Sequence, residues 1–220
     1  MVNRIIPFSS VDGPGNRTAV FLQGCNIDCK YCHNPETRHM CEECGVCVEQ
    51  CPVGALSMGE NGKIDWKEEL CVQCDTCIHV CPHGSSPRTH VMTAGETYKK
   101  VKKQIPFIRG ITVSGGECML QPQFLLELFR LAKEDGLSTM IDSNGMVPFQ
   151  DYPELLEITD GVMLDIKAFD REEHRKVTGA YNDIVLANAE YLARKSKLFE
   201  VRAVIVPDLY DTERSVRQMG

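Results

Sequence analysis

Residues 19–35 read AVFLQGCNIDCKYCHNP, and this stretch decides the fold. Its first five residues are almost entirely apolar and predict a short buried strand. The next glycine leads directly into Cys25, Cys29 and Cys32, which are spaced C-x3-C-x2-C. The sequence therefore places a three-cysteine loop at the C-terminal end of a strand.

The chain around this loop alternates expected strands with expected helices. Apolar runs predict strands at residues 19–23, 110–114, 137–142, 161–168 and 199–206. Capping residues, prolines and apolar periodicity predict helices at residues 93–104, 122–136, 148–157 and 183–196. This alternation is typical of an α/β fold with parallel strands and right-handed crossovers. The pattern alone leaves open whether the sheet stays open or curves into a barrel.

Eight more cysteines form two runs that each read C-x2-C-x2-C-x3-C-P and begin 30 residues apart. In bacterial ferredoxins with this spacing, three close thiolates hold one [4Fe-4S] cluster and the fourth reaches the other cluster. The predicted ligand sets are Cys41, Cys44, Cys47 with Cys81, and Cys71, Cys74, Cys77 with Cys51. Two zinc sites are the weaker alternative. We expect residues 41–90 to be an inserted ferredoxin-like domain and residues 1–40 and 91–220 to form the main α/β domain.

Composition and charge exclude several classes of protein. The 220 residues carry 24 Lys and Arg against 31 Asp and Glu, a formal charge of −7 that argues against a nucleic-acid binder. Charged residues or glycines interrupt every hydrophobic segment, so we expect no membrane span. The N-terminus lacks the apolar core of a secretory signal. We therefore expect a cytoplasmic protein whose 12 cysteines serve as thiolates rather than disulfides.

The three-cysteine loop differs from the two longer runs because it has no fourth cysteine nearby. A cubane cluster held here would keep one iron without a protein ligand, and an open coordination position is typical of catalytic metal sites. The alternative is that Cys118 or His33 closes the fourth position.

Polar residues follow the expected strands at their carboxyl ends, where ligands of parallel α/β proteins gather. They are Gly115, Gly116 and Glu117 after one strand, Asp142 and Ser143 at the end of the next, Asp165 and Lys167 on the following one, and Arg202 on the last. The mixture of carboxylates and cations predicts a site for a zwitterionic ligand.

The C-x3-C-x2-C loop after the first strand, with Gly-Gly-Glu after the second, resembles the radical S-adenosylmethionine (SAM) enzymes. The opening 35 residues, the ferredoxin-like insertion and the stretches ITVSGGE, IDSNGM and MLDIKA look like the glycyl-radical-enzyme activating enzymes, and the YjjW-type branch among them. The resemblance implies a partial (βα)6 TIM-like barrel. The chain ends after about five strands of the six in that barrel, so we expect a fragment that lacks the sixth.

The resemblance also implies a set of site residues. Cys25, Cys29 and Cys32 would hold a catalytic [4Fe-4S] cluster whose open iron is chelated by SAM, and Lys167 would take part in the reaction. The implied SAM contacts are Tyr31, His33, Gly116, Glu117, Asp165 and Lys167, and we add Gly115 and Arg202 to them from their positions at the strand ends. A monovalent cation is implied near Asp142, Ser143, Asp165 and the Met163 carbonyl. With the insertion, the implied cofactors are three [4Fe-4S] clusters and SAM.

The implied reaction is reductive cleavage of SAM to methionine and a 5′-deoxyadenosyl radical, which takes a hydrogen atom from a backbone glycine of a partner enzyme. An external reductant such as flavodoxin or ferredoxin would supply electrons through the insertion. The Asp12–Gly15 turn would lie near the mouth of the site, and we expect a monomer. Two alternatives are a radical SAM enzyme acting on a small molecule and a ferredoxin-like electron-transfer module.

Overall fold

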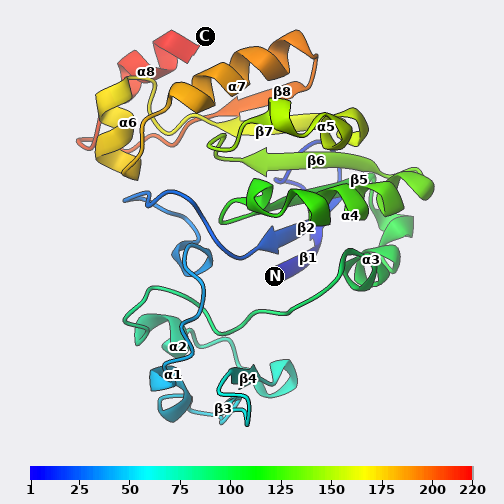
Figure 1. The fold of residues 1–220 in the computed structure, drawn as a ribbon, viewed down its shortest axis with the longest axis vertical. Helices are drawn as coiled ribbons and strands as arrows, with labels where there is room; N and C mark the ends of the chain where they lie inside the picture. The colour runs from blue at the N-terminus through cyan, green and yellow to red at the C-terminus, as the bar shows by residue number, and fades with distance from the viewer. Residues whose placement is uncertain (220) are drawn as a thin grey trace.

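The computed structural model describes residues 1–219, and at its centre is a 6-stranded sheet in the order β1–β2–β5–β6–β7–β8 (Figure 1). The strands are β1 (Val2–Ser9), β2 (Arg17–Leu22), β5 (Gly110–Gly115), β6 (Ser138–Ser143), β7 (Gly161–Asp165) and β8 (Leu198–Arg202). Strands β2 to β8 of this sheet run parallel, and β1 pairs antiparallel with β2 at the edge. The expected α/β class and mostly parallel sheet are confirmed, whereas β1 was not predicted.

Helices between and after the parallel strands complete the main body. They are α3 (Ala94–Lys102), α4 (Pro122–Glu134), α5 (Pro153–Ile158), α6 (Arg171–Thr178), α7 (Asp183–Arg194) and α8 (Thr212–Met219). Short 3-10 helices span Pro35–Thr37, Glu68–Leu70, Ile105–Phe107, Cys118–Leu120 and Phe149–Asp151. Helices α3, α4 and α5 lie side by side against the sheet (Figure 1). Their buried faces and the strands form the main hydrophobic core, which includes Val20, Ile111, Phe129 and Ile141.

Two helical segments differ from the sequence prediction for local reasons. The helix expected at 148–157 is divided, because Pro153 restricts the residue before it and can only begin a new helix. The charged run 171–176, for which no helix was predicted, belongs to α6. Asp170 begins this helix by accepting hydrogen bonds from the backbone N–H groups of Glu172 and Glu173.

Residues 41–90 lie beyond the β1 edge of the sheet, in the lower part of Figure 1. They contain α1 (Val46–Glu49), α2 (Thr76–His79) and a hairpin of β3 (Leu56–Met58) and β4 (Ile64–Trp66). Isolated bridges join the segment to the main body, Val2 with His90 and His39 with Ser85. No helix in the described part of the chain is long and apolar enough to cross a membrane.

Candidate functional site

The three-cysteine loop leaves β2 at its C-terminal end and is anchored by its own backbone. The N–H of Gly24 donates to the Thr37 carbonyl and that of Cys25 to the Arg38 carbonyl, both at 2.8 Å. The loop follows the strand, as the sequence predicted, and these two hydrogen bonds close it on itself.

The backbone at Gly115 and Gly116 passes against the start of this loop. Gly116 donates its N–H to the Leu22 carbonyl at 3.0 Å, and Glu117 donates to the Gly24 carbonyl at 2.7 Å. A Cβ atom on Gly115 would lie 2.2 Å from the Leu22 oxygen, and one on Gly116 would lie 2.3 Å from the Gly24 oxygen. Gly115 also has φ +129°, which favours glycine. The two glycines are therefore required by close approach of two backbone segments.

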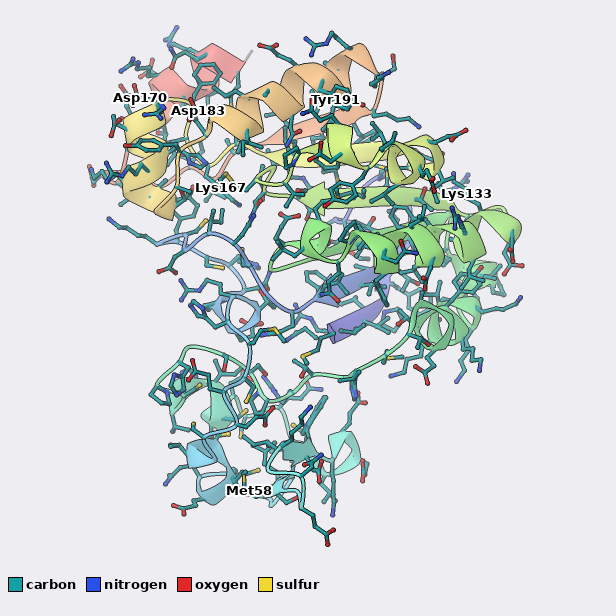
Figure 2. All side chains as sticks on the ribbon, viewed as in Figure 1. Met58, Lys133, Lys167, Asp170, Asp183 and Tyr191 are labelled. Carbon is teal, nitrogen blue, oxygen red and sulfur yellow. The ribbon has the colours of Figure 1, made fainter. Side chains whose placement is uncertain are left out.

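A cavity of about 440 Å³ opens beside the loop at the carboxyl ends of the strands. Twelve of the predicted site residues line it: Cys25, Cys29, Tyr31, Cys32, His33, Gly115, Gly116, Asp142, Ser143, Asp165, Lys167 and Arg202. Asp12, in the turn expected near the mouth, lines it as well. Figure 2 shows Lys167 between α6 and the loop that follows β2. Residues distant in sequence thus meet at one hollow, as their positions at strand ends predicted.

Two ion pairs set the charge of this cavity. Lys167 Nζ lies 2.6 Å from an Asp165 carboxylate oxygen, and Arg202 lies 3.5 Å from Asp142. Burial raises the pKa of Asp142 to about 6, the Asp165 charge adds to this, and Arg202 opposes it. Burial lowers the pKa of Lys167, but the charge and hydrogen bond of Asp165, together with the charges of Cys29 and Asp142, raise it by more. The cavity thus carries paired carboxylates and cations.

Among the predicted SAM contacts, Glu117 is the one that does not line the cavity. Its side chain is buried, and its carboxylate accepts hydrogen bonds from Met119 N at 2.8 Å, Ser143 Oγ at 2.9 Å and Asn144 N at 2.7 Å. Burial raises the pKa of Glu117 to about 7, although these hydrogen bonds oppose the shift. In this structure Glu117 joins the loop after β5 to the end of β6.

Asn144, which was not among the predicted site residues, lies at the same junction and contacts the cysteine loop. Its side-chain amide nitrogen lies 3.6 Å from Cys25 Sγ and 2.9 Å from Asn26 Oδ1. The stretch Asp-Ser-Asn-Gly signals a tight turn, but a contact across 119 residues of sequence carries no local signal.

Tyr31 bridges the cavity and the C-terminal part of the chain. Its hydroxyl donates to the Lys167 carbonyl at 2.8 Å, and its ring stacks on Tyr210 with ring centroids 6.5 Å apart. Burial raises the pKa of Tyr31. His33 is exposed at the cavity rim.

The thiols of the loop are partly or fully buried, and Cys118 is separate from them. Burial raises the pKa values of Cys25, Cys29 and Cys32, and Lys167 opposes this at Cys29 and Cys32. Cys118 has no exposed surface, belongs to the main hydrophobic core and donates to the Asp142 carbonyl at 3.4 Å. The Cys118 thiol therefore does not line the cavity with the three cysteines of the loop.

The structure groups the other eight cysteines around two small cavities. Cys41, Cys44, Cys47 and Cys81 line one, and Cys51, Cys71, Cys74 and Cys77 line the other. In Figure 2 yellow sulfur atoms gather in this part of the molecule, above the label of Met58. In the described residues, no three His, Cys, Asp or Glu side chains are arranged to hold a single metal ion.

The chain is similar to a family model, to curated proteins and to solved structures. Residues 19–218 match the model of the radical SAM superfamily. The chain is 34% identical over 229 residues to the pyruvate formate-lyase-activating enzyme of Streptococcus mutans, covering 100% of this chain and 70% of that enzyme. It is 32% identical over 237 residues to the isethionate sulfite-lyase activating enzyme of Desulfovibrio desulfuricans, covering 98% of this chain and 76% of that enzyme. The structure of QueE from Escherichia coli shares the fold, with a TM-score of 0.51 and 15% identity over 99% of this chain and 88% of that one.

Proposed function

The chain belongs to the radical SAM superfamily and, within it, to the activating enzymes of glycyl radical enzymes, and we propose that Cys25, Cys29 and Cys32 hold its catalytic [4Fe-4S] cluster. The residues present fit such a group. Iron–sulfur clusters are held by cysteine thiolates, and all three sulfur ligands line the same cavity. Cys118 lies apart in the hydrophobic core, which favours a fourth position left for SAM.

When bound, the cluster and SAM supply a 5′-deoxyadenosyl radical, which takes a hydrogen atom from a backbone glycine of the partner enzyme. This chain's own residues bind and orient SAM. Lys167 is placed to pair with the SAM carboxylate and Asp165 with its ammonium group, because both lie within the cavity and already form an ion pair. Arg202 pairs with Asp142 in the same cavity.

The backbone of Gly115 and Gly116 positions the cysteine loop relative to these charged groups. Because Gly116 is hydrogen-bonded to β2 and Glu117 to Gly24, the loop cannot move independently of the β5 strand. Glu117, whose carboxylate is turned to the β6 loop, supports this arrangement through the hydrogen bond from its backbone N–H to the Gly24 carbonyl. Tyr31 and His33 form the wall of the cavity toward which we place the adenine.

The insertion at residues 41–90 holds, in this proposal, two further [4Fe-4S] clusters that pass electrons from an external reductant such as flavodoxin or ferredoxin. The grouping of the cysteines around two cavities supports the crossed ligand sets, because each cavity takes three cysteines from one run and the fourth from the other. A monovalent cation near Asp142, Asp165 and the Met163 carbonyl is part of the proposal. Ser143 is its weakest ligand, because its hydroxyl already serves Glu117 and Gly145.

The single observation that carries the proposal is the cavity in which the three cysteines face paired Asp165 and Lys167. Its test is anaerobic reconstitution, followed by reduction with dithionite in the presence of SAM and a candidate glycyl radical enzyme. We expect about 12 iron atoms per chain, release of 5′-deoxyadenosine and a glycyl radical signal by electron paramagnetic resonance (EPR). About 8 iron atoms without SAM cleavage, in reconstituted protein that is folded, would contradict the catalytic cluster.

A matched control separates the two kinds of cluster. The Cys29→Ala variant should lose about four iron atoms and all 5′-deoxyadenosine release, yet keep the EPR signals of the insertion. The Cys118→Ala variant, which changes a buried cysteine outside the cavity, should keep the full iron content. Cleavage of SAM by the Cys29→Ala variant would overturn the assignment.

A further inference from the structure

We propose that Asn144 is a positioning residue that donates a hydrogen bond to the Cys25 sulfur and thereby raises the reduction potential of the catalytic cluster. This inference rests on the proposed role of Cys25 as a cluster ligand. The contact is the 3.6 Å approach of the Asn144 amide nitrogen to Cys25 Sγ, within the distance for a hydrogen bond to sulfur.

The orientation of the Asn144 side chain is determined by its other partners. Its oxygen accepts a hydrogen bond at 2.9 Å from the backbone N–H of Met146, which can only donate. Its nitrogen must therefore face the cysteine loop, where the oxygen of Asn26 accepts one of its two hydrogens at 2.9 Å. The second hydrogen is left for the Cys25 sulfur.

The backbone of Asn144 is fixed as firmly as its side chain. Its N–H donates to Glu117 at 2.7 Å, and the same carboxylate is bound by Met119 and Ser143. Asn144 itself is only 6% exposed, so water does not compete freely for its amide. A donor held in place in a buried site acts on a neighbouring charge without reorganising.

A fixed donor beside a cluster sulfur favours the reduced cluster. Reduction adds one electron, supplied by dithionite in the test below, and makes the cluster one charge more negative. A hydrogen bond to a sulfur ligand is therefore worth more after reduction than before, and such bonds are among the factors that set cluster potentials. No covalent bond forms or breaks in this effect.

The contact distinguishes Cys25 from the other two cysteines of the loop. In the part of the chain that the structure describes, no side-chain N–H group is hydrogen-bonded to the sulfur of Cys29 or Cys32. Within the described residues, the side-chain N–H hydrogen bond to a sulfur of this loop therefore comes from Asn144.

The test is a redox titration of the holoenzyme, following the EPR signal that changes when SAM is added. We expect Asn144→Ala to lower the ratio of reduced to oxidised cluster at a fixed potential about tenfold, which corresponds to about 59 mV for a one-electron couple. Asn144→Asp, which has the same shape but places an acceptor at the sulfur, should lower it further. Asn144→Ser, which can donate from its hydroxyl, should recover part of the loss.

Asn188→Ala is the matched control. Asn188 is also a buried amide, and it holds the same loop by donating to the carbonyls of Gly145 and Val147, but it does not contact a cysteine. We expect it to lower thermal stability without shifting the potential. An equal shift in both Ala variants, or an unshifted potential in Asn144→Ala and Asn144→Asp, would overturn the inference. A wild-type protein without the SAM-dependent signal would instead refute the proposed function.

Discussion

Asp165 and Lys167 form an ion pair of 2.6 Å inside the cavity that the three-cysteine loop lines. Asp165 is the last residue of β7, and Lys167 lies two positions beyond it. Both side chains are largely buried, at 25% and 16% exposure. Such a pair is costly to desolvate, and in the proposed function it exchanges partners with the zwitterionic end of SAM.

The Lys167→Met variant should therefore bind SAM at least about tenfold more weakly. The substitution removes the cation that would pair with the SAM carboxylate, and it leaves Asp165 unpaired. Equilibrium dialysis with the reconstituted enzyme measures this loss. Lys195→Met, which changes an exposed lysine on the far end of α7, is the control and should bind as the wild type does. Equal binding by Lys167→Met would remove Lys167 from the SAM site.

The crossed ligand sets predict which double substitutions act on the same cluster. Cys44→Ala combined with Cys81→Ala touches one cluster and should cost about four iron atoms per chain. Cys44→Ala combined with Cys51→Ala touches both and should cost about eight. Iron analysis and EPR spin counting distinguish the two results, and the reverse order would show that each run holds its own cluster.

Gly116→Ala should displace the cysteine loop, because the new Cβ would lie 2.3 Å from the Gly24 carbonyl oxygen. We expect a lower melting temperature and loss of about four iron atoms from the catalytic cluster. Gly95→Ala is the control. Gly95 lies in α3 with no atom within 4 Å of a Cβ placed there, so this change should stabilise the protein by about 0.5–1 kcal/mol. Full iron content in Gly116→Ala would contradict the close approach.

The pKa of Glu117 predicts a pH dependence of stability. Burial raises this pKa from 4.5 to about 7, so the folded protein binds the proton more tightly than the unfolded chain. Protonation of Glu117 therefore contributes about 3 kcal/mol to the free energy of unfolding. This contribution is fully present below about pH 4.5 and is lost as the pH rises through about 7.

Urea unfolding of the metal-free protein between pH 5 and pH 8 tests this effect. Compared with the wild type, Glu117→Gln should have a free energy of unfolding that falls less steeply with pH over this range. The variant should also be less stable at pH 5, because the glutamine amide nitrogen that replaces one carboxylate oxygen only donates and cannot accept the hydrogen bond from the Asn144 N–H. Parallel pH curves would show that Glu117 stays ionised when folded.

The parallel strands were predictable because each is a short apolar run followed by glycine or polar residues. Strand β1 was missed because it contains Pro7 and has no regular alternation of buried and exposed residues, and because its pairing with β2 carries no local signal in the sequence. Helix α6 was missed because its residues are mostly charged, although Asp170 followed by Glu173 is a capping signal that could have found it.

The site was predictable to the extent that strand ends converge. Asp142, Asp165, Lys167 and Arg202 were identified from their positions alone, and all line the cavity. The direction of the Glu117 side chain and the contact of Asn144 with Cys25 could not be predicted, because both depend on how two loops pack. Sequence position predicts which residues are near a site better than it predicts which way they face.

The contact between Gly24 and Gly116 has a consequence for how this protein can be altered. The two segments lie more than 90 positions apart in the sequence, and their backbones fit closely against each other. Neither segment can therefore be exchanged alone. A chimaera that takes the cysteine loop from a relative but keeps its own Gly-Gly turn should assemble only if the two parental backbones match at this point. Recombination between homologues is therefore expected to succeed when both segments are inherited together.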